Sequence, residues 1–109
     1  MEVDLHLHTT ASDGRLTPGE VVQVAVRKGL TIIAITDHDS VEGVSPAMEA
    51  AAHFPSLRVI PGVEINTDAP EGAVHILGYF MDYEDVEFQR GLKILRHSRE
   101  LRAQKMLAK

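Results

Sequence analysis

Residues 31–39 read TIIAITDHD, and this stretch decides the fold prediction. Its first six residues form a short apolar run rich in β-branched side chains, which is typical of a strand buried in a parallel sheet. The residues before it, 17–29, predict a helix that begins with a capping box formed by Thr17 and Glu20. A strand predicted over 2–9 precedes that helix, so the chain opens with a strand, a helix and a strand.

The chain after this stretch continues the same alternation. Helices are predicted over 45–54 and 85–109, and strands are predicted over 57–67 and 72–80. Pro61 and Gly62 predict a bulge or kink in the third strand. The alternation predicts an α/β fold built from right-handed parallel units, in which ligands bind at the carboxyl ends of the strands.

Composition and charge narrow the class of protein. The chain has 109 residues, enough for one domain at most, and it contains no cysteine, which excludes disulfides, thiolate zinc sites and cysteine nucleophiles. Its N-terminus lacks the basic segment and apolar run of a signal peptide, and no apolar stretch approaches the ~20 residues of a membrane span. We therefore expect a cytoplasmic protein that does not enter a membrane.

The net charge of −5 is unevenly distributed. Residues 1–89 carry four basic and fifteen acidic residues, a charge of −11, whereas residues 90–109 carry seven basic residues and one acid, a charge of +6. An acidic body suits cations, and a basic helix over 85–109 suits anions such as phosphate, although a solvated amphipathic helix would also explain its charge.

Imidazole and carboxylate groups occur at or near the carboxyl end of every predicted strand. They are His6, His8, Asp13, Asp37, His38, Asp39, Glu64 and His75. A single histidine of this kind is more often exposed or hydrogen-bonded in a core than bound to a metal. The pair His6 and His8 is more telling, because alternate strand residues share a face. Together these groups predict a metal cluster.

The donor types indicate which metal chemistry to expect. Nitrogen and oxygen ligands without sulfur favour zinc, manganese or iron, and more than four ligands indicate more than one ion. Adjacent ions clamp a phosphoryl group and lower the pKa of a bridging water, so that hydroxide is available near neutral pH. Hydrolysis of a phosphate ester is the natural reaction. The sequence has no G-x-S-x-G elbow and no Gly-rich phosphate loop, which argues against a covalent route or an NTPase.

Five motifs together resemble the PHP (polymerase and histidinol phosphatase) superfamily of metal-dependent phosphoesterases. They are DLHLHT (4–9), SDG (12–14), TDHD (36–39), PGVE (61–64) and HILGY (75–79). In detail the chain is most similar to the RNase AM or TrpH-like branch, which includes 3′,5′-nucleotide bisphosphatases and a 5′→3′ exoribonuclease. The stretches TTASDG, LTPGE, AITDHD, IPGVEI and a late R-x-x-R-A-Q carry that similarity.

The resemblance implies a distorted (β/α)7 barrel with up to three divalent ions, manganese, zinc or iron. Its metal ligands would be His6, His8, Asp13, His38, Glu64 and His75. Asp13, His38 and Glu64 would also serve catalysis, with Glu64 bridging two ions. Asp37 and Asp39 would orient ligands, although Asp39 could equally cap the next turn. His53 and His97 do not lie at strand ends and are left out of the site.

Two arginines of the last helix are candidates for substrate binding. Arg99 lies in the middle of the apolar face that Phe88 and Leu92 begin, and Arg102 lies near its edge. Such arginines either extend toward solvent or turn inward to grip a phosphate. The resemblance at R-x-x-R-A-Q favours the second interpretation, with a nucleotide or short RNA as the substrate.

The chain is shorter than the implied barrel, which takes around 200 residues or more. No Asp-x-His pair, which family members supply from their C-terminal half, follows His75. We therefore expect residues 1–109 to be the N-terminal portion of a PHP domain, completed by a missing C-terminal half or by a second chain. Two alternatives to the nucleotide phosphoesterase are a histidinol-phosphatase-like or polymerase-associated exonuclease domain, and a non-catalytic metal-binding fragment or interaction domain.

Overall fold

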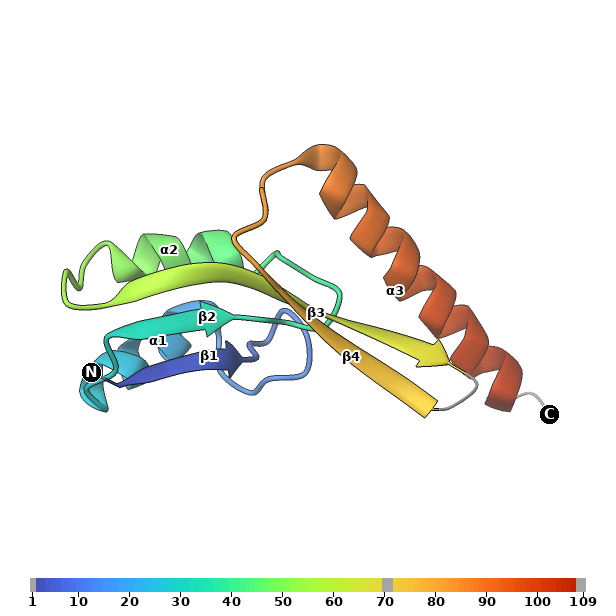
Figure 1. Ribbon diagram of the computed structural model, residues 1–109, viewed down its shortest axis with the longest axis horizontal. Helices are drawn as coiled ribbons and strands as arrows, with labels where there is room; N and C mark the ends of the chain where they lie inside the picture. Colours follow the sequence, from blue (N-terminus) through green and yellow to red (C-terminus); the bar gives the residue numbers. More distant parts are fainter. Residues whose placement is uncertain (1, 70–71, 108–109) are drawn as a thin grey trace.

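The fold alternates strands and helices as the sequence predicts. The computed structural model describes residues 2–69 and 72–107, with side chains described outside 67–74 and 99–107. Its elements are β1 (Val3–Leu7), α1 (Pro18–Arg27), β2 (Ile32–Ile35), α2 (Val44–Ala51), β3 (Arg58–Ala69), β4 (Gly72–Tyr79) and α3 (Val86–Leu107) (Figure 1). The predicted α/β class is confirmed.

The four strands form one sheet in the order β1-β2-β3-β4. The first three strands run parallel, as predicted, whereas β4 runs antiparallel to β3. Only two residues separate β3 from β4, too few for the crossover that a parallel pair needs. The alternation of strands with helices therefore holds as far as β3, and β3 and β4 form a hairpin.

β3 changes its partner at Pro61 and Gly62. Its first residues pair with β2 as far as Ile35 opposite Pro61, and its pairing with β4 starts at Gly62 opposite Tyr79. Both registers advance one residue at a time, so the predicted bulge is absent there. A side chain at Gly62 would lie 3.0 Å from the Ile35 carbonyl oxygen, which shows that glycine permits a close approach of β2.

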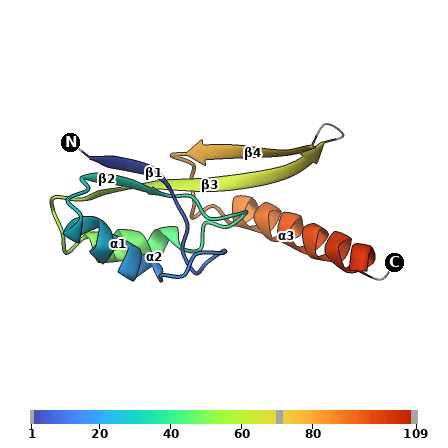
Figure 2. The same cartoon turned by 90° about the horizontal axis from the view of Figure 1, so that it is seen from below.

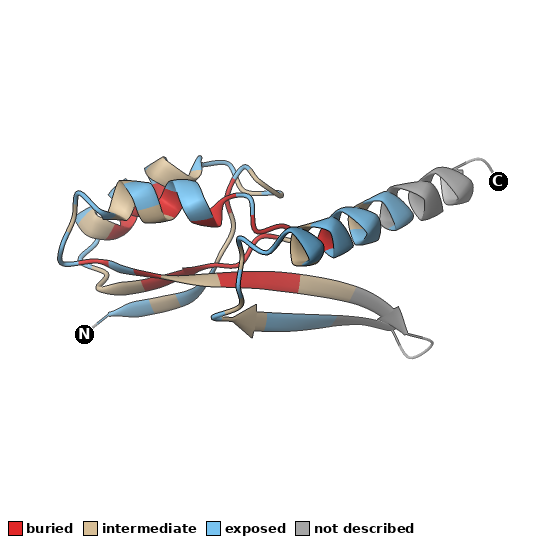
Figure 3. Ribbon diagram, turned by 90° about the horizontal axis from the view of Figure 1, so that it is seen from above, coloured by how far each residue is buried: buried red, intermediate tan, exposed pale blue. Residues whose placement is uncertain are grey.

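α1 and α2 cover one face of the sheet (Figure 2). The predicted capping box of α1 is confirmed, because the Thr17 hydroxyl accepts from the Glu20 amide and the Glu20 carboxylate accepts from the Thr17 amide. The apolar residues of the two helices and of β2 and β3 bury one another along the middle of the sheet (Figure 3). Ile33 and Ile35 of β2 are fully buried, as expected for a central strand.

Among the described side chains of α3, those of Phe88, Leu92 and Arg96 contact the body. Leu92 is buried in the core and Phe88 packs against it, which confirms the start of the predicted apolar face. Arg99 and Arg102 lie within the span of α3, but their side chains lie outside the described residues, so their role stays a prediction. Among the described helices, none is long and apolar enough to cross a membrane.

Two glycine substitutions should separate close packing from helix propensity. Gly62→Ala forces its new methyl group against Ile35 and Thr36, and we expect it to lower the free energy of unfolding by ~1–3 kcal/mol. Gly91→Ala, within α3, meets no atom within 4 Å and should raise that free energy by up to ~1 kcal/mol. Urea unfolding followed by circular dichroism measures both, and equal effects of the two changes would contradict the close approach at Gly62.

Candidate metal centre

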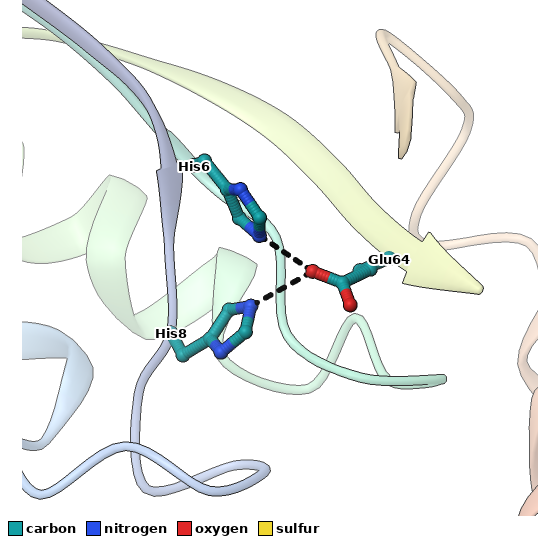
Figure 4. Close-up of side chains that lie close together, drawn as sticks. All are labelled: His6, His8 and Glu64. Carbon is teal, nitrogen blue, oxygen red and sulfur yellow. Dashed lines mark hydrogen bonds and ion pairs between the residues drawn. The ribbon is translucent and has the colours of Figure 1, made fainter. Parts of the chain in front are cut away.

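The carboxylate of Glu64 lies at the centre of the site. Its side chain, on β3, is 4% exposed. Its Oε1 atom lies 2.5 Å from Nε2 of His6 and 3.1 Å from Nε2 of His8 (Figure 4). Its Oε2 atom lies 3.0 Å from Nδ1 of His75 and 3.2 Å from Nδ1 of His38. Four imidazoles from different parts of the chain thus converge on one buried carboxylate.

The short second strand explains how these residues meet. β2 separates β1 from β3 in the sheet, but it ends at Ile35. The side chains of His6, on β1, and of His8, which follows β1, therefore both reach Glu64 (Figure 4). His38 follows β2 and makes an isolated parallel bridge with Glu64, which continues the ladder for one more pair.

His75 reaches the site by a different route from the one predicted. We expected every strand to deliver its polar residue near its carboxyl end, and for β4 this is wrong. Because β4 is antiparallel to β3, its first half lies beside the residues that follow Glu64, and His75 pairs with Asn66. The hairpin thus brings His75 to the same end of the sheet as the other candidate ligands.

Asp13 adds a second group of donors beside the first. Its Oδ1 atom lies 2.9 Å from Nδ1 of His8, and its Oδ2 atom lies 3.1 Å from Nε2 of His38. Two sets of ligand atoms are each close enough to hold an ion: His6, His8 and Glu64, and His8, Asp13 and His38. The sets share His8, which has a nitrogen in contact with each carboxylate. Asp13 is 64% exposed, so solvent reaches the second set.

The two carboxylates remain charged in this environment. Burial alone would raise the pKa of Glu64, but its contacts with His6, His75 and His8 lower that pKa to about 2. Desolvation also raises the pKa of Asp13, but the nearby His38 and His8 lower it by more. The net result is a pKa below the usual value for an aspartate. A buried anion surrounded by nitrogen donors is the environment that a divalent cation completes, so these residues fit a metal centre.

Asp37 holds the loop that connects His8 to Asp13. Its side chain is fully buried, and its carboxylate accepts hydrogen bonds from the Thr9 amide at 2.5 Å, the Thr9 hydroxyl at 2.7 Å and the Ser12 hydroxyl at 2.8 Å. These donors belong to the loop itself rather than to candidate ligands. Asp37 therefore holds the loop that carries the candidate ligands, and its role in orienting them stays a prediction.

Asp39 and Arg96 fix the loop after His38. Asp39 has a left-handed backbone (φ 48°), its amide donates to the Glu64 carbonyl at 2.9 Å, and its carbonyl accepts from Nη1 of Arg96 at 2.6 Å. Nη2 of Arg96 also lies 3.5 Å from the carboxylate of Glu42. Sequence reasoning missed Arg96, because the spacing along α3 does not reveal which arginine faces a distant loop.

Sequence reasoning also missed Asn66. It follows Glu64 by two residues on β3, and its side-chain amide lies between His38 and His75. The period of two along a strand could have identified it, because that period places residues 64 and 66 on one face. His53 and His97, which were left out of the site, are both exposed.

The family model for the PHP domain matches residues 4–103. The 3′,5′-nucleoside bisphosphate phosphatase of Chromobacterium violaceum is 38% identical over 104 residues, 95% of this chain and 36% of that relative. The 5′-3′ exoribonuclease Rnm of Escherichia coli is 46% identical over 80 residues, 72% of this chain and 27% of that relative. The chain thus spans about a third of the length of these curated relatives.

A solved structure shares the fold. A crystal structure from Bifidobacterium adolescentis, described provisionally as a metal-dependent phosphoesterase, superposes with a TM-score of 0.84 at 31% identity. The match covers 96% of this chain and 37% of that one. The arrangement of strands and helices described above is therefore found within a longer experimental structure.

Removing the charge of Glu64 should weaken the binding of metal ions at the candidate centre. We expect Glu64→Gln to lower the Zn²⁺ affinity at least ~10-fold, because a neutral amide replaces the carboxylate that four imidazoles surround. Calorimetric titration with Zn²⁺ measures this affinity. Glu49→Gln, an exposed position on α2, is the matched control and should bind as wild type does. Equal affinities for the two variants would contradict the assignment of Glu64.

Removing the Asp37 carboxylate should destabilise the loop that it holds. Asp37→Ala leaves the Thr9 amide and the Thr9 and Ser12 hydroxyls without this acceptor, and we expect a loss of ~1–3 kcal/mol in the free energy of unfolding. Asp82→Ala, at an exposed position, should change it by less than ~0.5 kcal/mol. Urea unfolding compares the two, and a neutral Asp37→Ala would show that the loop does not depend on this network.

Proposed function

The chain belongs to the PHP domain family, and from this premise we propose that it carries metal ligands of a phosphoesterase that acts on nucleotides or short RNA. Matched relatives include a nucleoside bisphosphate phosphatase and an exoribonuclease, so hydrolysis in general has direct support. The particular substrate is our proposal, as is a cytoplasmic location, which the cysteine-free composition suits.

The convergence of four imidazoles on the buried carboxylate of Glu64 carries this proposal. We assign the metal ligands to six residues: His6, His8, Asp13, His38, Glu64 and His75. Their nitrogen and oxygen donors suit manganese, zinc or iron, and two overlapping sets of donors suit more than one ion. Such ions offset the charge of a phosphoryl group and acidify water near neutral pH.

The residues themselves divide the remaining work. Glu64 stays anionic, as its pKa of about 2 requires, and its two oxygens face different imidazoles, which suits a bridging role. Asp13 is exposed, so its carboxylate can accept a hydrogen bond from a water molecule and orient it. His38 contacts both carboxylates and fixes their separation. Arg99 and Arg102 are proposed to bind the phosphate of the substrate.

A panel of phosphate esters tests the proposal. The chain, completed by the C-terminal half that the implied barrel requires and loaded with Mn²⁺ or Zn²⁺, is offered a 3′,5′-bisphosphonucleoside, a 5′-phosphorylated RNA oligonucleotide and histidinol phosphate. We expect hydrolysis of the first two, measured as released phosphate or mononucleotide, and at least ~10-fold less with Glu64→Gln. Glu49→Gln serves as the unaffected control.

The other outcomes distinguish the alternatives. Release of phosphate from histidinol phosphate alone would support a histidinol-phosphatase-like activity. Binding of metal without hydrolysis of any ester would support a non-catalytic metal-binding domain. Either result would overturn the nucleotide phosphoesterase for this chain.

A further inference from the structure

The side-chain amide of Asn66 lies between two candidate metal ligands. Asn66 shares a face of β3 with Glu64 and pairs with His75 across the hairpin. Its Nδ2 atom lies 2.6 Å from Nδ1 of His38, and its Oδ1 atom accepts a hydrogen bond from Nδ1 of His75. One short side chain therefore contacts two imidazoles that approach from β4 and from the loop after β2.

In both rings, the nitrogen that contacts Asn66 is Nδ1. With Nδ1 of His38 held by Asn66, its Nε2 atom points to Asp13, whose Oδ2 atom lies 3.1 Å away. An imidazole that binds a metal through one nitrogen is usually held at the other by a neighbouring polar group, which fixes the orientation of the ring. The contacts of Asn66 are of that kind.

The carboxylate of Glu64 also lies near these two nitrogens. Of the two possible partners, Asn66 is the one that stays available to the rings when Glu64 binds a metal ion. The Oε2 atom of Glu64 is 3.2 Å from Nδ1 of His38 and 3.0 Å from Nδ1 of His75. A carboxylate that serves as a metal ligand gives its lone pairs to the ion, whereas an amide side chain does not compete well for a divalent cation. The amide thus remains available to both rings.

We propose that Asn66 is a positioning residue of the metal centre, which contacts the Nδ1 atoms of His38 and His75 and thereby fixes the orientation of both rings. This inference rests on the metal centre proposed above. The amide suits the task because its Nδ2 atom can donate to Nδ1 of His38 while its Oδ1 atom accepts from Nδ1 of His75. A leucine has a similar size and offers neither group.

Calorimetric titration with Zn²⁺ tests the energetic part of this inference. We expect Asn66→Leu to bind Zn²⁺ ~10–100-fold more weakly than wild type. Gln89→Leu is the matched control, because it also replaces an amide by leucine but removes only a hydrogen bond to the Tyr83 carbonyl. It should bind Zn²⁺ within about twofold of wild type, since it touches none of the candidate ligands. Equal affinities of wild type and Asn66→Leu would overturn the inference.

Nitrogen NMR of the metal-free, ¹⁵N-labelled protein tests the geometric part, which a merely structural role would not produce. Because Asn66 donates to Nδ1 of His38 and accepts from Nδ1 of His75, we expect His38 to carry its proton on Nε2 and His75 to carry its proton on Nδ1. The same protonated nitrogen in both rings would overturn the inference. Asn66→Asp offers acceptors only and should move the His38 proton to Nδ1, so it serves if Asn66→Leu does not fold, and an unchanged His38 signature in Asn66→Asp would also count against us.

The two proposals fail in different ways. If wild type binds no Zn²⁺, the metal centre itself is wrong and the role of Asn66 falls with it. If wild type binds Zn²⁺ and Asn66→Leu binds it equally well, only the role of Asn66 is wrong.

Discussion

The burial of one carboxylate governs the arrangement of this molecule. A charged side chain that leaves water must be compensated, because its desolvation costs several kcal/mol even in real proteins. Glu64 is compensated by imidazoles from β1, from the loop after β2 and from β4, so those elements must bring these side chains to the same place. The short β2 and the change of partner along β3 both serve this convergence.

Around that carboxylate, a second layer of contacts fixes the backbone instead of the ligands. Asp37 ties down the loop that leads to Asp13, and Arg96 ties down the carbonyl of Asp39 beside His38. Asn66 acts between these layers, because it touches the rings directly. The site is thus positioned by buried polar groups that bind the loops, while the apolar core beneath α1 and α2 holds the sheet.

Much of this arrangement could be predicted from local patterns. The capping box of α1 and the buried run of β2 depend on neighbouring residues, and the structure confirms both. Polar residues near strand ends predicted a metal cluster, and the resemblance to the PHP superfamily narrowed it to six candidate ligands, which the structure brings together. The direction of β4 was missed, although the short link between the two predicted strands already excludes the crossover that a parallel pair needs. Arg96 was missed because its partners, Asp39 and Glu42, are distant in sequence.

The wide spacing of the candidate ligands has a consequence for how the chain folds. His6 contacts Glu64 across a sequence separation of 58 residues, whereas His75 contacts it within the β3–β4 hairpin. The complete set of candidate ligands therefore forms only after β1, β2, β3 and β4 have associated. Contacts of such long sequence separation form late and slow the search for the native state. An ion that needs all of them has little affinity for the unfolded chain, so its concentration would set the thermal stability of the protein by mass action.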